Sequence, residues 1–158
     1  MVIIGIVAVD RNLAIGKGGQ LPWHYSSDLK FFRAQTTGHA CVMGYNTWRT
    51  LKKPLPGRLN VVLSRRSEIA PQGGVVLLRD KLEVLSLVPY LGCDLFVIGG
   101  RQIYEAFIGE IDRWIVTEVP LAVEGADTFM PAAFLEGFKT VRALPLEEQL
   151  TVRFYERA

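Results

Sequence analysis

Eight short apolar segments, most of them rich in β-branched residues, constrain the fold of this chain more than any other feature. They cover residues 2–9, 40–43, 60–64, 74–78, 94–99, 113–119, 138–143 and 151–156. Several are continuously apolar, as in strands that are covered on both faces, whereas the last two alternate, as in an antiparallel edge. The pattern predicts a sheet of about eight strands with a buried centre.

Helix-like segments separate these strands, at residues 26–36, 46–51, 80–87 and 101–108. Strands that alternate with helices indicate βαβ crossovers, and hence a twisted, mostly parallel sheet with an antiparallel C-terminal edge and about four flanking helices. A length of 158 residues fits one domain. We therefore expect a single α/β domain over residues 1–158.

Charge and cysteine usage exclude several classes of protein. The net charge is only +2, and without a concentrated basic patch neither nucleic acid nor a membrane is an expected partner. Cys41 and Cys93 lie in apolar runs without Cys-x-x-Cys spacing, so we expect no metal site. The apolar N-terminal run is too short to span a membrane and lacks the basic start of a signal peptide. These features predict a cytoplasmic protein.

Asp28 is the most informative ionisable residue. In the predicted helix 26–36 it shares a face with Phe31 and Phe32. It could point to water and interact with the helix dipole, or it could be a buried carboxylate with a raised pKa that binds a cationic or multi-donor edge of a ligand. Trp23 could form a wall of the same pocket or belong to the core. Spacing alone leaves these alternatives open.

Two strand-to-helix turns contain glycine, at Gly44 and at Gly99-Gly100. Small residues let a ligand approach the backbone, and helix N–H groups can meet an anion. Each could be a simple tight turn, but two in one sheet suggest an extended ligand with more than one phosphate. Arg65 and Arg66, after strand 60–64, could add charge for a terminal phosphate or be solvated.

Further candidates lie in loops and in a strand. Arg58 follows a rigid Pro-Leu-Pro-Gly turn, and its planar guanidinium suits a carboxylate, although an exposed loop arginine is an equal alternative. Residues 16–22 are glycine-rich and form either a mobile lid or a solvated loop. His24 and His39 lack the spacing of a metal site or a triad and are interpreted as structural. Thr117 lies within a predicted strand.

Taken in order along the chain, these motifs resemble the dihydrofolate reductase family of bacterial type. They are Val9-Asp10-Arg11, Ile15-Gly16, Leu21-Pro22-Trp23, Asp28-Leu29, Phe32, the MGYNTW segment 43–48, the PLPGR segment 54–58, the VIGG segment 97–100, Tyr104, Thr117 and the EGAD segment 124–127. The resemblance covers essentially the whole chain. It implies an adenosine-binding subdomain at approximately residues 39–90. It also implies NADPH-dependent reduction of dihydrofolate to tetrahydrofolate, with hydride transfer to C6 of the pterin and protonation of N5.

The resemblance also implies roles in the substrate site. Asp28 would accept hydrogen bonds from the pterin N3 and 2-amino groups, Trp23 would hold an ordered water, and Thr117 would bond Asp28 and the ligand. Whether Asp28 passes a proton to N5 or only polarises the ring stays open. Arg58 would pair with the α-carboxylate of the glutamate tail. The catalytic set is Trp23, Asp28, Tyr104 and Thr117, and the substrate slot adds Ile6, Leu29, Phe32, Leu51, Leu55 and Ile98.

For the cofactor NADPH, the resemblance implies contacts with both glycine turns, a lid that begins at Ile15 and Gly16, and the loop after strand 60–64. It further implies a cis Gly99–Gly100 peptide, and a hydrogen bond from the lid to Asp127. The implied cofactor residues are Ile6, Ile15, Gly16, Gly44, Tyr45, Asn46, Thr47, Ser64, Arg65, Arg66, Ile98, Gly99, Gly100, Arg101, Gln102, Ile103 and Tyr104.

Three positions depart from the family pattern. Tyr45 stands where relatives usually have arginine or lysine, and Gln102 stands where an arginine often contacts phosphate. The preference for NADPH over NADH must then depend on Arg65, Arg66 or Arg101. Ile6 replaces an alanine of many bacterial relatives and should reshape the pocket for the pterin and for diaminopyrimidine inhibitors.

Two alternative functions stay open on the residues alone. The pyrimidine reductase of riboflavin synthesis shares this fold and NADPH, but its substrate gives no reason for the Leu21-Pro22-Trp23 and Asp28 set. A non-catalytic pteridine- or nucleotide-binding module would bind ligand without turnover. For the enzyme we expect a monomer, with dihydrofolate as its partner and no obligate protein partner.

Overall fold

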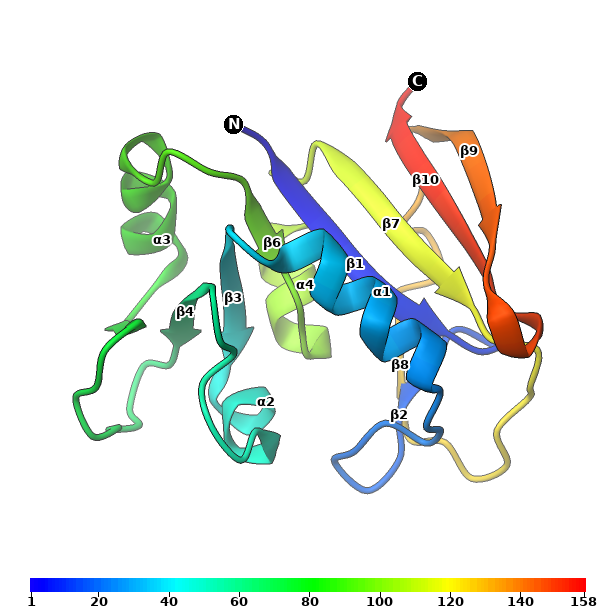
Figure 1. Cartoon of the computed structure of the whole chain (residues 1–158), viewed down its shortest axis with the longest axis horizontal. Coiled ribbons are helices and arrows are strands. Elements are labelled where there is room, and N and C mark those ends of the chain that lie inside the picture. The colour runs from blue at the N-terminus through cyan, green and yellow to red at the C-terminus, as the bar shows by residue number, and fades with distance from the viewer.

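The computed structural model describes residues 1–158 and contains an eight-stranded sheet in the order β5-β4-β3-β6-β1-β7-β10-β9 (Figure 1). All neighbouring strands are parallel except β10, which runs antiparallel to β7 and β9. The predicted fold class is therefore confirmed. The strands are β1 (Ile3–Val9), β3 (Ala40–Gly44), β4 (Leu59–Leu63), β5 (Val75–Leu78), β6 (Leu95–Val97), β7 (Arg113–Glu118), β9 (Phe138–Pro145) and β10 (Thr151–Arg157). The helices are α1 (Ser26–Thr36), α2 (Tyr45–Thr50), α3 (Lys81–Leu87) and α4 (Arg101–Phe107).

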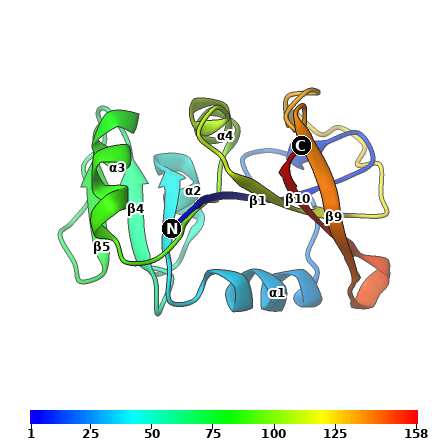
Figure 2. The same ribbon diagram turned by 90° about the horizontal axis from the view of Figure 1, so that it is seen from above.

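Helices cover both faces of the sheet, with α1 on one side and α3 and α4 on the other (Figure 2). Because side chains alternate along a strand, β1 contributes Ile4 and Ile6 to the core under α1, and Ile3 and Val7 to the opposite core. The central strands are thus apolar on both faces. This arrangement explains the continuous apolar runs in the sequence.

Four short elements escaped the sequence-based prediction. The strands β2 (Ala14–Gly16) and β8 (Thr128–Phe129) pair antiparallel in a separate two-stranded sheet. The turns η1 (Val88–Tyr90) and η2 (Glu147–Gln149) are single turns of 3₁₀ helix. Segments of two or three residues are too short to show a hydrophobic period.

The N-terminus of α1 is capped by a residue that is distant in the sequence. No side chain at the start of α1 caps it locally. Instead the carboxylate of Glu148, in η2, accepts the backbone N–H of Ser27 at 3.1 Å and the Ser27 hydroxyl at 2.8 Å. A negative group at this position also complements the helix dipole. The contact ties the helix that carries Asp28 to the β9–β10 connection.

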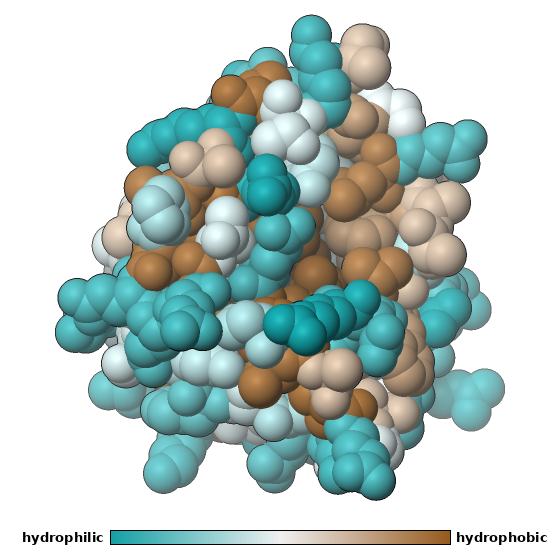
Figure 3. Space-filling view, turned by 90° about the vertical axis from the view of Figure 1, so that its right-hand side faces the viewer, coloured by the Kyte–Doolittle hydropathy of each residue, from teal (hydrophilic) through white to brown (hydrophobic).

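The outer strand β9 is exposed over most of its length. Its residues Lys139 and Arg142 place cations on the edge, which disfavours pairing with another strand. The face of the molecule seen in Figure 3 shows hydrophilic residues interrupting the hydrophobic areas. No helix in the structure combines the length and apolar character needed to cross a membrane.

Asp10 ties the end of β1 to two neighbouring loops. Its side chain is buried, and its carboxylate accepts the backbone N–H groups of Asn12 and Ala14, each at 2.8 Å, and of Val123 at 2.7 Å. Burial raises the pKa of Asp10, but these three hydrogen bonds together bring that pKa below its ordinary value of 3.8. The folded protein therefore holds Asp10 as a carboxylate.

We expect Asp10→Asn to lower the free energy of unfolding by about 2 kcal/mol at neutral pH, because an amide cannot accept all three N–H groups. The measurement is urea denaturation. Since the pKa of Asp10 is lower in the folded than in the unfolded chain, its contribution is present above 3.8 and is lost as pH falls through the folded pKa. The difference between wild type and variant should shrink on acidification, and a difference independent of pH would contradict this explanation.

Candidate active site

Asp28 and Thr117 meet between α1 and the sheet. The Thr117 hydroxyl, on β7, donates a hydrogen bond of 3.0 Å to Oδ1 of Asp28, in the first turn of α1. Phe31 and Phe32 dock the same face of α1 onto the apolar core, so Asp28 faces the sheet as well. The alternative in which Asp28 points to water is therefore wrong.

The surroundings of Asp28 make its ionised form less favourable than it is in water. Burial raises the pKa of Asp28 above 3.8, and the hydrogen bond from Thr117 offsets only part of this effect. The pKa of the Tyr104 hydroxyl is also raised, by burial and by the nearby charge of Asp28. That hydroxyl donates to the Ile6 carbonyl at 2.8 Å. Tyr104 is thus held neutral and fixed in position beside the carboxylate.

Trp23 supplies an unpaired donor. Its indole Nε1 is buried and forms no hydrogen bond within the protein. A buried N–H group without a partner is costly, so the site has a built donor for a polar atom of a ligand. The predicted role of Trp23 in the site fits this geometry.

The predicted substrate slot is largely one apolar cluster. The structure brings five of its residues together under α1, and these are Ile6, Phe32, Leu51, Leu55 and Ile98. Leu29 differs, because its side chain is 47% exposed. The cluster draws on β1, α1 and segments after α2 and β6, so the slot exists only in the folded chain.

Arg58 is buried, so the interpretation as an exposed loop arginine is wrong. Its Nε donates to the Pro56 carbonyl and its Nη1 to the Thr36 hydroxyl, each at 3.0 Å. Its guanidinium carbon lies 5.9 Å from the centre of the Phe32 ring. No carboxylate pairs with it. Sequence patterns gave no indication of Thr36 as its partner.

The two glycine turns lie against each other. The Gly44 N–H donates to the Gly99 carbonyl at 2.9 Å. A Cβ at Gly44 would lie 3.1 Å from Ile103, and one at Gly99, where φ is +113°, would lie 3.1 Å from the Tyr104 ring. The Gly99–Gly100 peptide is cis, as the resemblance implies. Glycine is required here because the two turns and α4 approach so closely.

Both turns open at the same edge of the sheet as the loop after β4. Gly44 is paired with Leu63 in the parallel β3–β4 ladder, so Ser64 begins its loop beside the first turn. In α/β sheets, nucleotides bind in the crevice outside such carboxyl ends. Around this edge lie the predicted residues Tyr45, Asn46, Thr47, Ser64, Arg65, Arg66, Arg101 and Gln102.

The three candidate arginines for a terminal phosphate differ in their partners. Arg101 is paired with Glu105 on α4. Arg65 and Arg66 are exposed and take part in no ion pair. Of the three candidates, these two are therefore the ones whose charge no acidic side chain neutralises.

The loop that follows β2 is attached to the loop before β8. The Gly18 N–H donates to Oδ2 of Asp127 at 2.8 Å, and the Lys17 ammonium donates to the Glu124 carbonyl at 2.9 Å. Ile15, at the base of this loop, lies in the same buried cluster as Tyr104. The contact between Asp127 and the loop 16–22 that the resemblance implies is observed.

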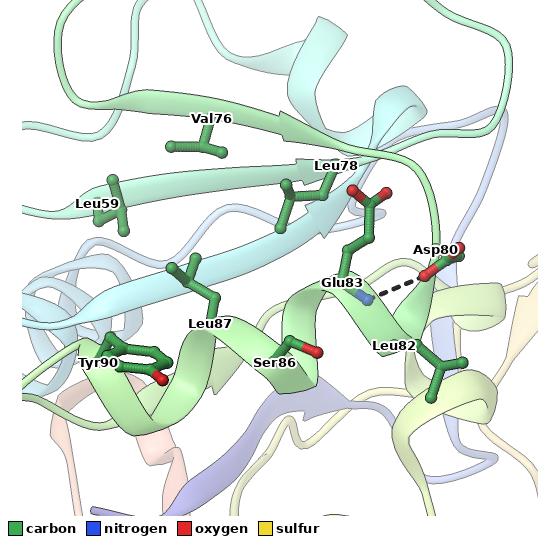
Figure 4. A pocket seen from close by; sticks show the side chains of 9 residues that line it. All are labelled: Leu59, Val76, Leu78, Asp80, Leu82, Glu83, Ser86, Leu87 and Tyr90. Carbon is green, nitrogen blue, oxygen red and sulfur yellow. Dashed lines mark hydrogen bonds between the residues drawn. The ribbon is translucent and has the colours of Figure 1, made fainter.

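A separate cavity of about 620 Å³ lies between α3 and the strands β4 and β5 (Figure 4). The one hydrogen bond drawn there is the cap of α3, in which Asp80 accepts the Glu83 N–H at 2.9 Å. None of the predicted site residues lines this cavity. Its lining is mainly apolar and comes from Leu59, Val76, Leu78, Leu82, Leu87 and Tyr90.

Two glycine turns at the carboxyl edge of parallel strands, next to the half-buried carboxylate of Asp28, are typical of the class of nucleotide-dependent α/β enzymes. A family model described as dihydrofolate reductase matches residues 2–156. The chain belongs to the dihydrofolate reductase family, and the resemblance inferred from its motifs is confirmed.

Individual relatives agree with this assignment. A dihydrofolate reductase of Neisseria meningitidis serogroup A is 39% identical over 128 residues, which cover 80% of this chain and 77% of the relative. One of Staphylococcus aureus is 32% identical over 149 residues, covering 93% and 90%. Dihydrofolate reductase from Enterococcus faecalis, solved in complex with NADP(H) and the compound RAB-propyl, superimposes with a TM-score of 0.89 at 28% identity. That alignment covers 99% of this chain and 96% of the other.

Proposed function

We propose that Asp28 anchors the pterin ring during the NADPH-dependent reduction of dihydrofolate to tetrahydrofolate, the reaction that this chain catalyses. The observation that carries the proposal is the hydrogen bond from the buried Thr117 hydroxyl to the half-buried carboxylate of Asp28. The carboxylate would accept hydrogen bonds from N3 and the 2-amino group of the pterin, and the low dielectric of the site strengthens such a charge-assisted pair. Thr117 keeps the carboxylate oriented toward the ring.

The neighbouring residues would orient the ring and exclude water. The five-residue apolar cluster under α1 would hold the pterin and the aminobenzoyl group, and Arg58 would pair with the α-carboxylate of the tail. The Trp23 N–H would hold a water or a polar atom of the ligand. Polarisation of the ring by Asp28 would favour protonation at N5.

The edge that carries the two glycine turns fits NADPH, which supplies the hydride when it is bound. Backbone N–H groups at the start of α2 and of α4, next to the glycine turns, would meet its phosphate groups. Ile6, Ile15, Ile98 and Tyr104 would flank the nicotinamide. Residues 39–90, which contain β3, β4 and β5 at one end of the sheet, would hold the adenosine.

The pair Arg65 and Arg66 would select NADPH over NADH through the additional phosphate. We expect the double substitution Arg65→Ala with Arg66→Ala to raise KM for NADPH by about 10- to 100-fold and to change KM for NADH by less than about twofold. Steady-state kinetics with each cofactor measures this. Lys139→Ala on the exposed strand β9 is the control for loss of a surface cation. An equal change for both cofactors would contradict this role.

The activity itself is tested by the loss of NADPH absorbance on addition of dihydrofolate. The proposed function requires oxidation that depends on this substrate. Oxidation that depends instead on the pyrimidine intermediate of riboflavin synthesis would support the alternative reductase. Binding of dihydrofolate without oxidation would support a non-catalytic binding module.

The enzyme would act as a monomer in the cytoplasm. The cations on the edge strand β9 support the monomer, and the two free cysteines fit a reducing compartment. Light scattering of the purified protein would give the mass, and 17.6 kDa is the value expected for one chain.

A further inference from the structure

The buried hydroxyl of Thr36 bridges α1 and Arg58. Thr36 is the last residue of α1 and is fully buried. Its Oγ1 donates to the Phe32 carbonyl at 2.8 Å and accepts from Nη1 of Arg58 at 3.0 Å. A hydroxyl has one hydrogen, and the Phe32 carbonyl takes it. The lone pairs of Oγ1 are therefore directed to the guanidinium.

Arg58 is held in place and yet has no anionic partner in the protein. Its two internal hydrogen bonds use Nε and Nη1, and Nη2 bonds to no protein atom. Burial lowers the pKa of Arg58; the neighbouring Cys41 offsets part of this effect, and the charge of Arg33 adds to it. A buried guanidinium without a carboxylate is unfavourable. The arrangement has the features of a donor group fixed in advance for an anionic ligand.

We propose that Thr36 is a positioning residue for the tail of the substrate. By holding Nη1 of Arg58, its hydroxyl directs the unused N–H groups of the guanidinium to the substrate carboxylate. This inference rests on the proposed role of Arg58. An arginine side chain has many rotamers, and holding one of them before binding removes much of the entropic cost of forming the pair.

The neighbouring residue Thr37 offers a matched control. Its hydroxyl donates to the Arg33 carbonyl at 2.6 Å, which is the same i to i−4 bond that Thr36 makes. Thr37 is exposed and makes no hydrogen bond to Arg58. Replacing either threonine by valine removes a hydroxyl of the helix end with little change in shape, but only Thr36→Val releases the guanidinium.

The test compares two substrates, which are dihydrofolate and a dihydropterin that carries a methyl group in place of the tail. For Thr36→Val we expect KM for dihydrofolate to rise about tenfold, with kcat and the affinity for NADPH within about twofold of wild type. KM for the tailless dihydropterin should not change. Thr36→Ser, which keeps the hydroxyl, should restore most of the affinity, and Thr37→Val should behave as wild type.

Arg58→Ala separates a failure of this inference from a failure of the proposed function. If Arg58→Ala does not selectively weaken the tail-bearing substrate, the role of Arg58 is wrong. If Arg58→Ala is selective but Thr36→Val leaves both KM values unchanged, or raises both equally, the inference about Thr36 is overturned. Should Thr36→Val fail to fold, Thr36→Ala is subjected to the same comparison and the same criteria.

Discussion

Replacing Asp28 by asparagine is expected to lower kcat for dihydrofolate reduction by about 100- to 1000-fold and to leave the affinity for NADPH within about twofold. Asparagine keeps the shape of the side chain and can still accept the Thr117 hydroxyl. It lacks the charge that would bind N3 and the 2-amino group of the pterin and polarise the ring. The measurements are steady-state turnover and a titration of the cofactor. Turnover equal to wild type would refute the role of Asp28.

The same substitution should stabilise the ligand-free protein at neutral pH. The pKa of Asp28 is higher in the folded chain than its ordinary value of 3.8, because burial disfavours the charge. For such a group, the stabilising contribution is complete below the unfolded pKa and is lost as pH rises through the folded pKa. Asparagine removes the buried charge, so thermal denaturation at neutral pH should give a higher Tm. A lower Tm would show that the ionised carboxylate contributes to stability.

Asp80→Asn is the matched control for Asp28→Asn. Asp80 also lies at a helix N-terminus, where it caps α3 by accepting the Glu83 N–H. Asparagine caps a helix about as well as aspartate. Asp80→Asn should therefore change neither turnover nor the Tm appreciably, and any effect of Asp28→Asn then depends on its place in the site.

Gly5→Ala is expected to lower the free energy of unfolding by about 3 kcal/mol, the largest effect on stability predicted for a single methyl group in this protein. Gly5 on β1 is paired with Trp114 on β7. A Cβ at Gly5 would lie 2.4 Å from two carbons of the Trp114 ring. That ring is fully buried, and Phe134 packs on it with centroids 5.0 Å apart. The indole therefore has no room to move. Chemical denaturation measures the loss.

Two further variants test this explanation. Gly109→Ala adds a methyl group where no atom lies within 4 Å and should be close to neutral. Trp114→Leu destabilises on its own by leaving a cavity, but it also creates space for the new methyl group. The loss of unfolding free energy in the double variant should therefore be smaller than the sum of the losses in the two single variants. Strict additivity would show that Gly5 is required for a reason other than the ring.

Local patterns were sufficient for the elements of this fold and for its family. The sequence pattern predicts helix 26–36 with the bounds observed in α1, and it predicts all eight strands of the main sheet to within one or two residues. Strands, helices and tight turns depend on residues that are close together in the chain, so apolar runs and glycines are enough to predict them. The pattern does not predict the β2–β8 pair, because strands of two or three residues are too short to show a hydrophobic period.

The motifs also located most of the candidate site. The sequence context alone indicates Asp28, Trp23 and the two glycine turns as candidate site residues. The sequence does not give the direction of these side chains, since residue type does not show whether an aspartate in the first turn of a helix faces water or the sheet. Arg58 could equally have been an exposed loop residue.

Tertiary structure decided those alternatives. The hydrogen bond between Thr117 and Asp28 joins residues 89 positions apart, and the one between Thr36 and Arg58 spans 22. The need for glycine at position 5 arises from an indole ring on a neighbouring strand. Which segments form strands and helices, and the family to which the chain belongs, follow from local patterns in the sequence. Only the packed structure decided which polar groups are buried and paired, because burial depends on contacts between segments that are distant in the chain.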